Sequence, residues 1–276
     1  MARTLRIGVI SGLGDGASNV LRRAHDLRLN GCQLSCWDPV LYTEEAAEQV
    51  STASQQLDVE INTVWAGGPG KCVWNFHEGP GTIGIVPRSG RKVRIAALKA
   101  GADFAKRIGV RSITTHVGFI PEDPNDDLYK ETLQSLKEVA GYCHQLGLEF
   151  WFETGQETPV TLLRTMEDID TGNLGVNLDP ANLVLYGKAN PVDALDVFGQ
   201  YVRGVHAKDG LYPTNGRELG RETPLGEGKV DFPRLIGRLK DEFGFSGHLT
   251  IEREISGPQQ LKDIQAAIQL LRPLCE

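Results

Sequence analysis

Residues 148–179 read LEFWFETGQETPVTLLRTMEDIDTGNLGVNLD. A mostly apolar run, Leu148–Glu153, precedes a helix expected to begin near Pro159, and a second run, Asn173–Asp179, follows that helix. Both runs are continuous rather than alternating, which is typical of parallel strands covered on both faces. The stretch therefore predicts a strand, a helix and a second strand, with a carboxylate at the end of each strand.

The same unit recurs along the whole chain. Eight apolar runs are separated by longer stretches of helical period, such as residues 232–243, where apolar side chains recur on one face. The runs are Leu5–Ser11, Gly31–Cys36, Asp58–Trp65, Arg111–Val117, Leu148–Glu153, Asn173–Asp179, Val202–Ala207 and Gly247–Glu252. Eight such units in roughly 250 residues predict an α/β protein with one domain, residues 1–276, folded as a closed (β/α)₈ TIM barrel.

An open, doubly wound sheet is the alternative arrangement of such units. It predicts a Gly-rich phosphate loop after an early strand. The stretch Gly12–Gly16 is rich in Gly but does not match the G-x-G-x-x-G pattern, so the closed barrel is favoured.

Composition excludes several classes of protein. With 276 residues, of which 40% are hydrophobic, the chain is not intrinsically disordered. The net charge is −7 and no basic run is longer than Gly90–Arg94, which argues against a nucleic-acid partner. No apolar run approaches the ~18 residues of a membrane span, and the first apolar run favours a buried strand over a signal peptide. Of five Cys only Cys32 and Cys36 lie close together, so we expect reduced thiols in a cytoplasmic protein.

Ionisable side chains gather where the last four predicted strands end. Glu153, Asp179, His206 and Glu252 come from successive strands, and a TIM barrel places all these ends at one mouth. Three clustered carboxylates would repel one another, and a divalent cation removes that cost. One imidazole with three carboxylates suits Mn²⁺ or Mg²⁺, with Co²⁺ as a further option and zinc less favoured.

Five motifs give the chain a recognisable signature. They are Glu153-Thr-Gly-Gln-Glu157, Asn177-Leu-Asp-Pro-Ala-Asn182, Val205-His-Ala-Lys-Asp209, Pro224-Leu-Gly-Glu-Gly228 and Ile251-Glu-Arg253. With them, the sequence resembles the xylose-isomerase-like TIM-barrel superfamily of sugar isomerases and epimerases over essentially its whole length. The resemblance implies one metal held by Glu153, Asp179, His206 and Glu252. In the ketose 3-epimerase branch, the residues matching Glu153 and Glu252 also serve as the acid–base pair.

The chain departs from two branches of this superfamily. The 3-epimerases and the abasic-site endonucleases carry His three residues after the strand-six Asp, where this chain has Asn182. The endonucleases also need further His ligands for three zinc ions, and the third predicted strand ends Thr63-Val-Trp65 without one. The endonuclease is therefore disfavoured, and the epimerase subtype stays open.

Further residues are predicted to contact substrate, each with a structural alternative. An Arg after strand seven binds substrate in the resembling 3-epimerases; Arg221 matches it best, and Arg217 is also available. Lys208 and Asp209 either orient the substrate or form an ion pair. Glu157 is a substrate contact or a helix cap, and His116 lines the mouth or lies in the core. The full set of predicted substrate contacts is His116, Glu157, Asn182, Lys208, Asp209, Arg221, Trp65 and Trp74.

We expect a metal-dependent isomerase or epimerase that acts on a ketose or keto-sugar through a cis-enediolate. Glu153 would remove the proton and Glu252 would return it. A lyase or dehydratase on a keto-sugar or keto-glycoside shares the first step and is the main alternative. An abasic-site endonuclease and a non-catalytic sugar-binding barrel are the remaining alternatives. The expected partner is a small sugar, with neither nucleic acid nor membrane, and a homo-oligomer is expected because barrels of this type are often dimers or tetramers.

Two long segments follow predicted strands. Ala66–Ser89 is rich in Gly and Pro and contains Trp74, so we expect a lid over the barrel mouth, with hinges at its Gly residues. A static loop packed on its own aromatic rings is the alternative. A second insert, Gly210–Gly228, follows strand seven.

Overall fold

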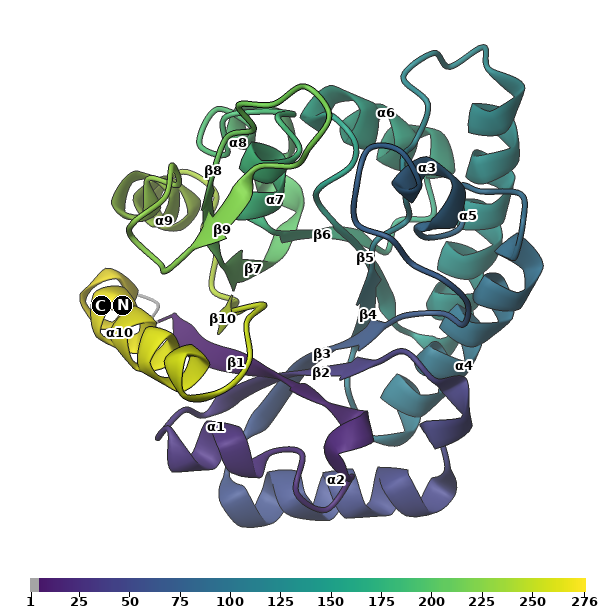
Figure 1. Ribbon diagram of the computed structural model, residues 1–276. Helices are drawn as coiled ribbons and strands as arrows, with labels where there is room; N and C mark the ends of the chain where they lie inside the picture. The colour runs from purple at the N-terminus through teal and green to yellow at the C-terminus, as the bar shows by residue number, and fades with distance from the viewer. Residues whose placement is uncertain (1–4) are drawn as a thin grey trace.

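The computed structural model of the protein describes residues 5–276 and shows a closed barrel of parallel strands inside a ring of helices (Figure 1). The strands follow one another around the barrel in the order β1-β10-β7-β6-β5-β4-β3-β2. They are β1 (Arg6–Gly12), β2 (Gly31–Cys36), β3 (Glu60–Ala66), β4 (Ser112–Thr115), β5 (Glu149–Glu153), β6 (Leu174–Leu178), β7 (Val202–Ala207) and β10 (His248–Ile251). The predicted (β/α)₈ TIM barrel is therefore confirmed.

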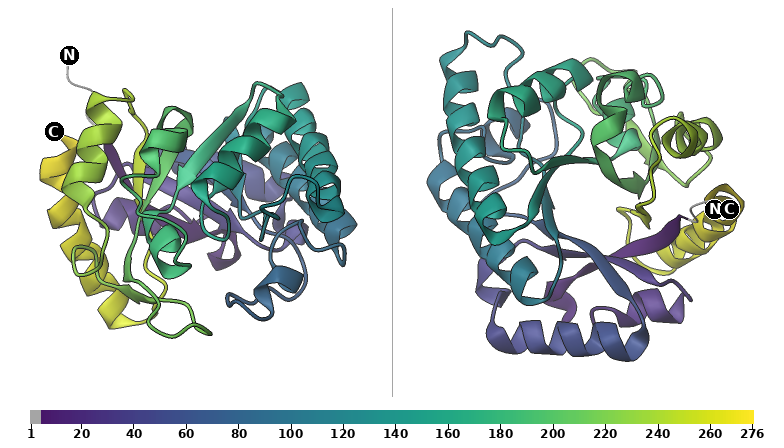
Figure 2. Two further views of the ribbon diagram at one scale, coloured as in Figure 1. Left: turned by 90° about the horizontal axis from the view of Figure 1, so that it is seen from above. Right: turned by 180° about the vertical axis from the view of Figure 1, so that it is seen from behind.

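Helices connect the strands and cover the outside of the barrel (Figures 1 and 2). They are α1 (Arg22–Asp26), α2 (Glu44–Leu57), α3 (Gly79–Thr82), α4 (Arg91–Arg107), α5 (Asp127–Leu146), α6 (Pro159–Ile169), α7 (Pro180–Leu185), α8 (Leu195–Phe198), α9 (Phe232–Asp241) and α10 (Pro258–Cys275). Short 3₁₀ turns lie at Leu13–Asp15, Pro39–Leu41 and Gly199–Tyr201. The end of the chain packs against its beginning, because the Leu5 amide donates to the Cys275 carbonyl at 3.1 Å.

All eight predicted runs form barrel strands, six of them with bounds shifted by one or two residues, and two of these shifts have a clear local reason. The third strand begins at Glu60 rather than Asp58, because Asp58 caps the end of α2 in the left-handed conformation with φ 53°. The sixth strand ends at Leu178, because Asp179 is already the N-cap of α7. This cap fixes the direction of the Asp179 side chain at the strand end.

Strand β5 illustrates how the barrel aims a functional side chain. Phe150 and Phe152 are fully buried and pack edge to face with ring centroids 5.1 Å apart. Because side chains alternate across a strand, Trp151 and Glu153 lie on its other face. Apolar burial on one face of β5 thus positions the carboxylate that ends the strand.

Two segments lie at the same end of the barrel. The long segment after β3 carries α3, and the insert after β7 forms an antiparallel hairpin of β8 (Asp209–Leu211) and β9 (Arg221–Thr223). Figure 2 shows both on one side in the view from above. They rise from the carboxyl ends of β3 and β7, so they surround the barrel mouth. None of the helices in the described part of the chain combines the length and hydropathy needed to cross a bilayer.

Candidate metal centre and active site

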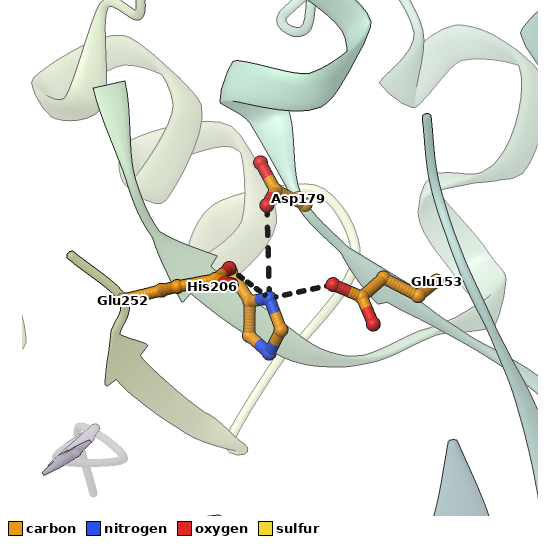
Figure 3. Close-up of side chains that lie close together, drawn as sticks. All are labelled: Glu153, Asp179, His206 and Glu252. Carbon is orange, nitrogen blue, oxygen red and sulfur yellow. Dashed lines mark ion pairs between the residues drawn. The ribbon is translucent and has the colours of Figure 1, made fainter. Parts of the chain in front are cut away.

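Four side chains from consecutive strands of the barrel meet at its mouth (Figure 3). Glu153 ends β5, Asp179 follows β6, His206 lies in β7 and Glu252 follows β10. One ligand atom from each residue lies within 4.8 Å of all the others, and all four residues are buried. The structure thus brings together the four residues that the sequence predicts as metal ligands.

His206 presents its Nδ1 atom to the three carboxylates. Nδ1 lies 2.9 Å from Glu252 Oε2, 3.0 Å from Glu153 Oε1 and 3.7 Å from Asp179 Oδ2. The other ring nitrogen, Nε2, lies 2.6 Å from Gln33 Oε1 on β2. The same Nε2 also lies 2.9 Å from Asn177 Nδ2, so two buried amide side chains hold this edge of the ring and Nδ1 faces the carboxylates.

Asp179 is held by its neighbours so that one oxygen stays available. Its Oδ1 accepts the backbone N–H of Asn182 at 2.8 Å, as the N-cap of α7. The Thr154 hydroxyl lies 2.9 Å from both the backbone nitrogen and the backbone oxygen of Asp179. The remaining oxygen, Oδ2, faces the cluster.

The charges in the cluster depend strongly on one another. Burial disfavours every charged form, yet His116 and His206 hold the pKa of Glu153 below its usual value. Burial also acts to raise the pKa of Glu252, but Lys208 and His206 outweigh it and hold that pKa well below its usual value. At Asp179 burial prevails over Lys208 and raises the pKa to about 6. The positive charges of His116, His206 and Lys208 thus offset the negative charge of the buried carboxylates only in part.

The donor set fits a hard divalent cation. Within residues 5–276, both Glu153 carboxylate oxygens, Asp179 Oδ2, His206 Nδ1 and Glu252 Oε2 have no hydrogen-bond partner. Buried polar atoms are rarely left without a hydrogen-bond partner, and one atom from each of the four residues lies within 4.8 Å of the others. Three carboxylates and one imidazole can coordinate Mg²⁺ or Mn²⁺, and a divalent ion would also complete the charge balance.

His116 and two predicted tryptophans lie next to this cluster. His116 Nε2 is 3.2 Å from Glu153 Oε1. The Trp65 ring lies 6.0 Å from the His116 ring and 5.9 Å from that of His206, and the Trp74 ring lies 4.9 Å from that of His116. These side chains line the side of the mouth nearest to Glu153.

Lys208 and Asn182 are also part of the site. Lys208 Nζ lies 3.6 Å from both Asp179 Oδ2 and Glu252 Oε2, and 2.7 Å from Glu254 Oε1. Asn182 Oδ1 accepts from Lys208 at 3.4 Å, and its Nδ2 donates to the Thr154 carbonyl at 3.3 Å. The ion pair between Lys208 and Asp209, the alternative to a role in orienting substrate, does not form, because Lys208 pairs with other carboxylates.

Asp209 has a structural role. Its carboxylate accepts the backbone N–H groups of Gly210, Gly226, Gly228 and Val230 at 2.8–3.0 Å. These four bonds tie both ends of the insert after β7 to one buried side chain. These contacts engage both carboxylate oxygens, so the structure gives no support to the predicted substrate contact at Asp209.

Two further predicted substrate contacts, Glu157 and Arg221, lie in opposite surroundings, one buried and the other exposed. The helix cap considered for Glu157 is provided by Thr158, whose hydroxyl accepts from the Thr161 N–H. Glu157 is buried instead, and burial raises its pKa to about 7. Arg221 is exposed at the start of β9, and no hydrogen bond or ion pair joins it to the cluster in the part of the chain that is described. The structure does not bring it to the metal ligands.

The segment 66–89 reaches across the mouth. Trp74 contacts His116 after β4, while the Phe76 ring lies 6.0 Å from that of Tyr186 at the end of α7. Arg94 of α4 donates to the carbonyls of Pro69, Lys71 and Gly84 at 2.7–3.4 Å. The segment therefore covers part of the mouth, as predicted, and is anchored from below by one buried side chain.

Sequence reasoning missed the residues that orient the ligands. Gln33 and Thr154 contact His206 and Asp179, and Glu254 pairs with Lys208. A signal for Gln33 was present, because it is a polar residue in the apolar run Gly31–Cys36. Such a residue in a buried strand needs a polar partner.

Comparisons with known proteins agree with this geometry. The family model described as xylose isomerase-like TIM barrel matches residues 21–274. A crystal structure of a xylose isomerase domain protein from Planctomyces limnophilus is 34% identical, with a TM-score of 0.92 over 98% of this chain and 97% of that one. A xylose isomerase-like TIM-barrel protein from Mycobacterium smegmatis, in complex with magnesium, is 18% identical, with a TM-score of 0.70 over 100% and 99% of the two chains.

A curated relative is more distant. Uncharacterized protein MJ1311 of Methanocaldococcus jannaschii is 26% identical over 175 residues, which are 59% of this chain and 58% of the relative. Structures that share the fold at 12–20% identity include ketose 3-epimerases and a probable 3-DHS dehydratase, and at that identity they show the fold alone. The family model and the metal-ligand cluster lead to one assignment: the chain belongs to the xylose isomerase-like TIM-barrel family.

Proposed function

We propose that the protein is a divalent-metal-dependent isomerase or epimerase that acts on a ketose or keto-sugar. The observation that carries the proposal is the buried cluster of Glu153, Asp179, His206 and Glu252, in which one ligand atom of each residue lies within 4.8 Å of all the others. The solved epimerases with the same fold support this class of reaction.

The four clustered residues would hold the cation, with Mn²⁺ or Mg²⁺ as the best match to their donor atoms. A cation bound there would supply Lewis acidity, which polarises a carbonyl and a neighbouring hydroxyl and so acidifies the C–H bond between them. Gln33 and Thr154 would keep His206 and Asp179 oriented toward it.

Glu153 and Glu252 would transfer the proton. They approach His206 from opposite sides (Figure 3), so each can face one side of a flat substrate carbon. Glu153 would accept the proton from the C–H bond, and Glu252, which is ionised beforehand, would first take up a proton from the substrate hydroxyl or from water and then deliver it to the opposite face. Delivery to the same carbon inverts its configuration, and delivery to the neighbouring carbon isomerises the sugar.

The walls of the mouth would keep water from the reacting carbons. Trp65 and Trp74 flank His116, and Trp74 belongs to the segment that lies across the mouth. Exclusion of water protects a reactive deprotonated sugar from side reactions.

The experiment that tests the proposal is a panel of keto-sugars incubated in D₂O with Mn²⁺ and followed by NMR. We expect solvent exchange at a carbon beside the carbonyl, with inversion or isomerisation, and loss of both in Glu153→Gln and Glu252→Gln. Glu167→Gln is the matched control, because Glu167 is exposed on α6. Full turnover by Glu153→Gln would rule out its role as the base.

A lyase is the second candidate, and Glu157 is the observation that favours it. Its carboxyl is 2% exposed, its pKa is raised to about 7 by burial, and it lies within the electrostatic influence of His116. A carboxyl that carries a proton near neutral pH can donate it to a leaving group. In the same assay, release of water or an aglycone that Glu157→Gln abolishes would favour the lyase. Exchange without such release would favour the epimerase.

A further inference from the structure

Gln156 and Tyr186 lie beside the metal-ligand cluster without taking part in it. Gln156 follows Glu153 by three residues, in the loop between β5 and α6, and Tyr186 ends α7, the helix that Asp179 caps. The side chains are 1% and 5% exposed. Both residues are thus connected to a metal ligand through a short stretch of ordered chain.

The polar atoms of this pair are buried without partners. Among the atoms of residues 5–276, none forms a hydrogen bond with Gln156 Oε1, Gln156 Nε2 or the Tyr186 hydroxyl. Folding removes these atoms from water and returns no hydrogen bond, which destabilises the folded protein. Buried polar atoms without a hydrogen-bond partner in a native structure are often explained by a bound water or ligand.

The two side chains are neighbours and stay uncharged. Burial raises the pKa of the Tyr186 phenol to about 12, and the Gln156 amide, which is near enough to interact with the ionised phenol through a weak hydrogen bond, opposes that rise. Lys208 opposes it too, so the phenol lies within the electrostatic influence of a residue that pairs with the cluster. Lys208 itself is paired with Asp179, Glu252 and Glu254, so its charge is already balanced.

Aromatic rings surround the phenol. The Phe76 and Phe119 rings meet the Tyr186 ring nearly at right angles, with centroids 6.0 and 5.8 Å away. Phe76 belongs to the segment that lies across the mouth. Apolar rings around a few polar atoms are the usual lining of a small-molecule site.

We propose that Gln156 and Tyr186 form a second binding subsite, the Gln156–Tyr186 subsite, which holds hydroxyl groups at the uncharged end of a sugar whose other end occupies the metal-ligand cluster. The amide and the phenol each donate and accept hydrogen bonds, and so does a hydroxyl. A phosphate or carboxylate would be buried against two neutral groups, which is costly. The inference rests on the proposed function, because it assigns the far end of the same substrate.

The test measures sugar binding to the Mn²⁺-loaded protein by NMR saturation transfer. The probes are D-fructose and D-tagatose, each compared with its 6-phosphate. The variants are Tyr186→Phe and Gln156→Met, which remove the polar atoms and keep the bulk. Tyr129→Phe is the matched control, because the buried Tyr129 hydroxyl already has a partner, Asp168 at 2.6 Å.

We expect a free ketose to bind, and each subsite variant to weaken that binding about 10-fold, as loss of neutral hydrogen bonds does. KM should rise more than kcat falls, and the affinity for Mn²⁺ should not change. Melting temperature should not fall in the subsite variants, because the deleted atoms have no partner in the protein. It should fall in Tyr129→Phe, with sugar binding unchanged.

Three results would overturn the subsite. They are sugar affinity unchanged in both variants, no binding of either free ketose to the wild type, and tighter binding of the 6-phosphates than of the free sugars. Failure of the proposed function looks different. Sugar binding that depends on Gln156 and Tyr186, without exchange of any sugar C–H proton, keeps the subsite and removes the isomerase or epimerase.

Discussion

The Nε2 atom of His206 lies 2.6 Å from Gln33 Oε1, and this contact helps to turn the other ring nitrogen, Nδ1, toward the three carboxylates. Gln33 is fully buried in β2, on the opposite side of the barrel from β6 and β5, and its side chain holds the ring of a residue on β7. Partners of this kind orient metal-bound histidines and raise their basicity. Gln33 therefore supports the proposed metal site, although it offers no atom to the cluster.

Gln33→Met should weaken Mn²⁺ binding about 10- to 100-fold, as loss of a ligand-orienting partner does. The physical reason is that His206 loses a hydrogen-bond partner that holds its ring in place. The measurement is a Mn²⁺ titration followed by electron paramagnetic resonance. Gln145→Met, at an exposed position on α5, is the control and should bind Mn²⁺ like the wild type. Equal affinity in Gln33→Met and wild type would contradict the assignment.

The fold and the four candidate ligands could be predicted because each has a local cause. Short continuous apolar runs between helical stretches are typical of strands covered on both faces, and a side chain at the carboxyl end of such a strand points to the barrel mouth. Glu153 and Asp179 were found in this way. Their exact strand boundaries were less predictable, because Asp179 acts as a helix cap at the same time.

Contacts between distant parts of the chain could not be predicted. Gln33 meets His206 across 173 residues of sequence, and Lys208 chooses Glu254, 46 residues away, rather than the adjacent Asp209. Asp209 instead holds four backbone N–H groups, a role that depends on how the insert folds back. Which residues become partners depends on how the closed barrel brings distant segments together, and the local sequence pattern does not reveal it.

Arg94→Met should loosen the segment 66–89 and lower the free energy of unfolding by about 3 kcal/mol, because three carbonyls lose hydrogen bonds to one charged donor. The measurement combines urea unfolding with hydrogen exchange of residues 69–86. Lys92→Met, an exposed change on the same helix, is the control and should leave both unchanged. Unaltered exchange in Arg94→Met would show that the segment is held by other contacts.

Glu157→Gln should change how stability depends on pH. The pKa of Glu157 is raised from 4.5 to about 7, so the folded protein binds this proton more tightly than the unfolded chain does. The stability that it contributes is fully present below pH 4.5 and is lost as pH rises through 7. The variant should match the wild type at pH 4.5 and exceed it at pH 8 by up to about 3 kcal/mol.

The measurement for Glu157→Gln is the free energy of urea unfolding at the two pH values. Glu167→Gln, at an exposed position on α6, is the control and should show no such difference. If Glu157→Gln changed the free energy of unfolding equally at pH 4.5 and pH 8, the change would come from altered packing of the side chain rather than from its charge.

Trp74→Ala tests whether the segment 66–89 acts on substrate. The Trp74 ring lies 4.9 Å from the His116 ring and 6.3 Å from the Trp37 ring, yet it is 41% exposed. A half-exposed ring contributes little to stability but can exclude water from the reacting carbons. We expect kcat/KM for the keto-sugar identified in the D₂O panel to fall about 10-fold or more.

The affinity for Mn²⁺ and the melting temperature of Trp74→Ala should stay close to those of the wild type, because Trp74 is not one of the four candidate ligands and its ring contacts are with His116 and Trp37. Val40→Ala removes another exposed apolar side chain, 79% exposed, and serves as the control that should leave activity unchanged. Two outcomes would make the segment purely structural. One is unfolding of Trp74→Ala, and the other is unchanged turnover, since a ring that excludes water from the substrate must alter the rate when it is removed.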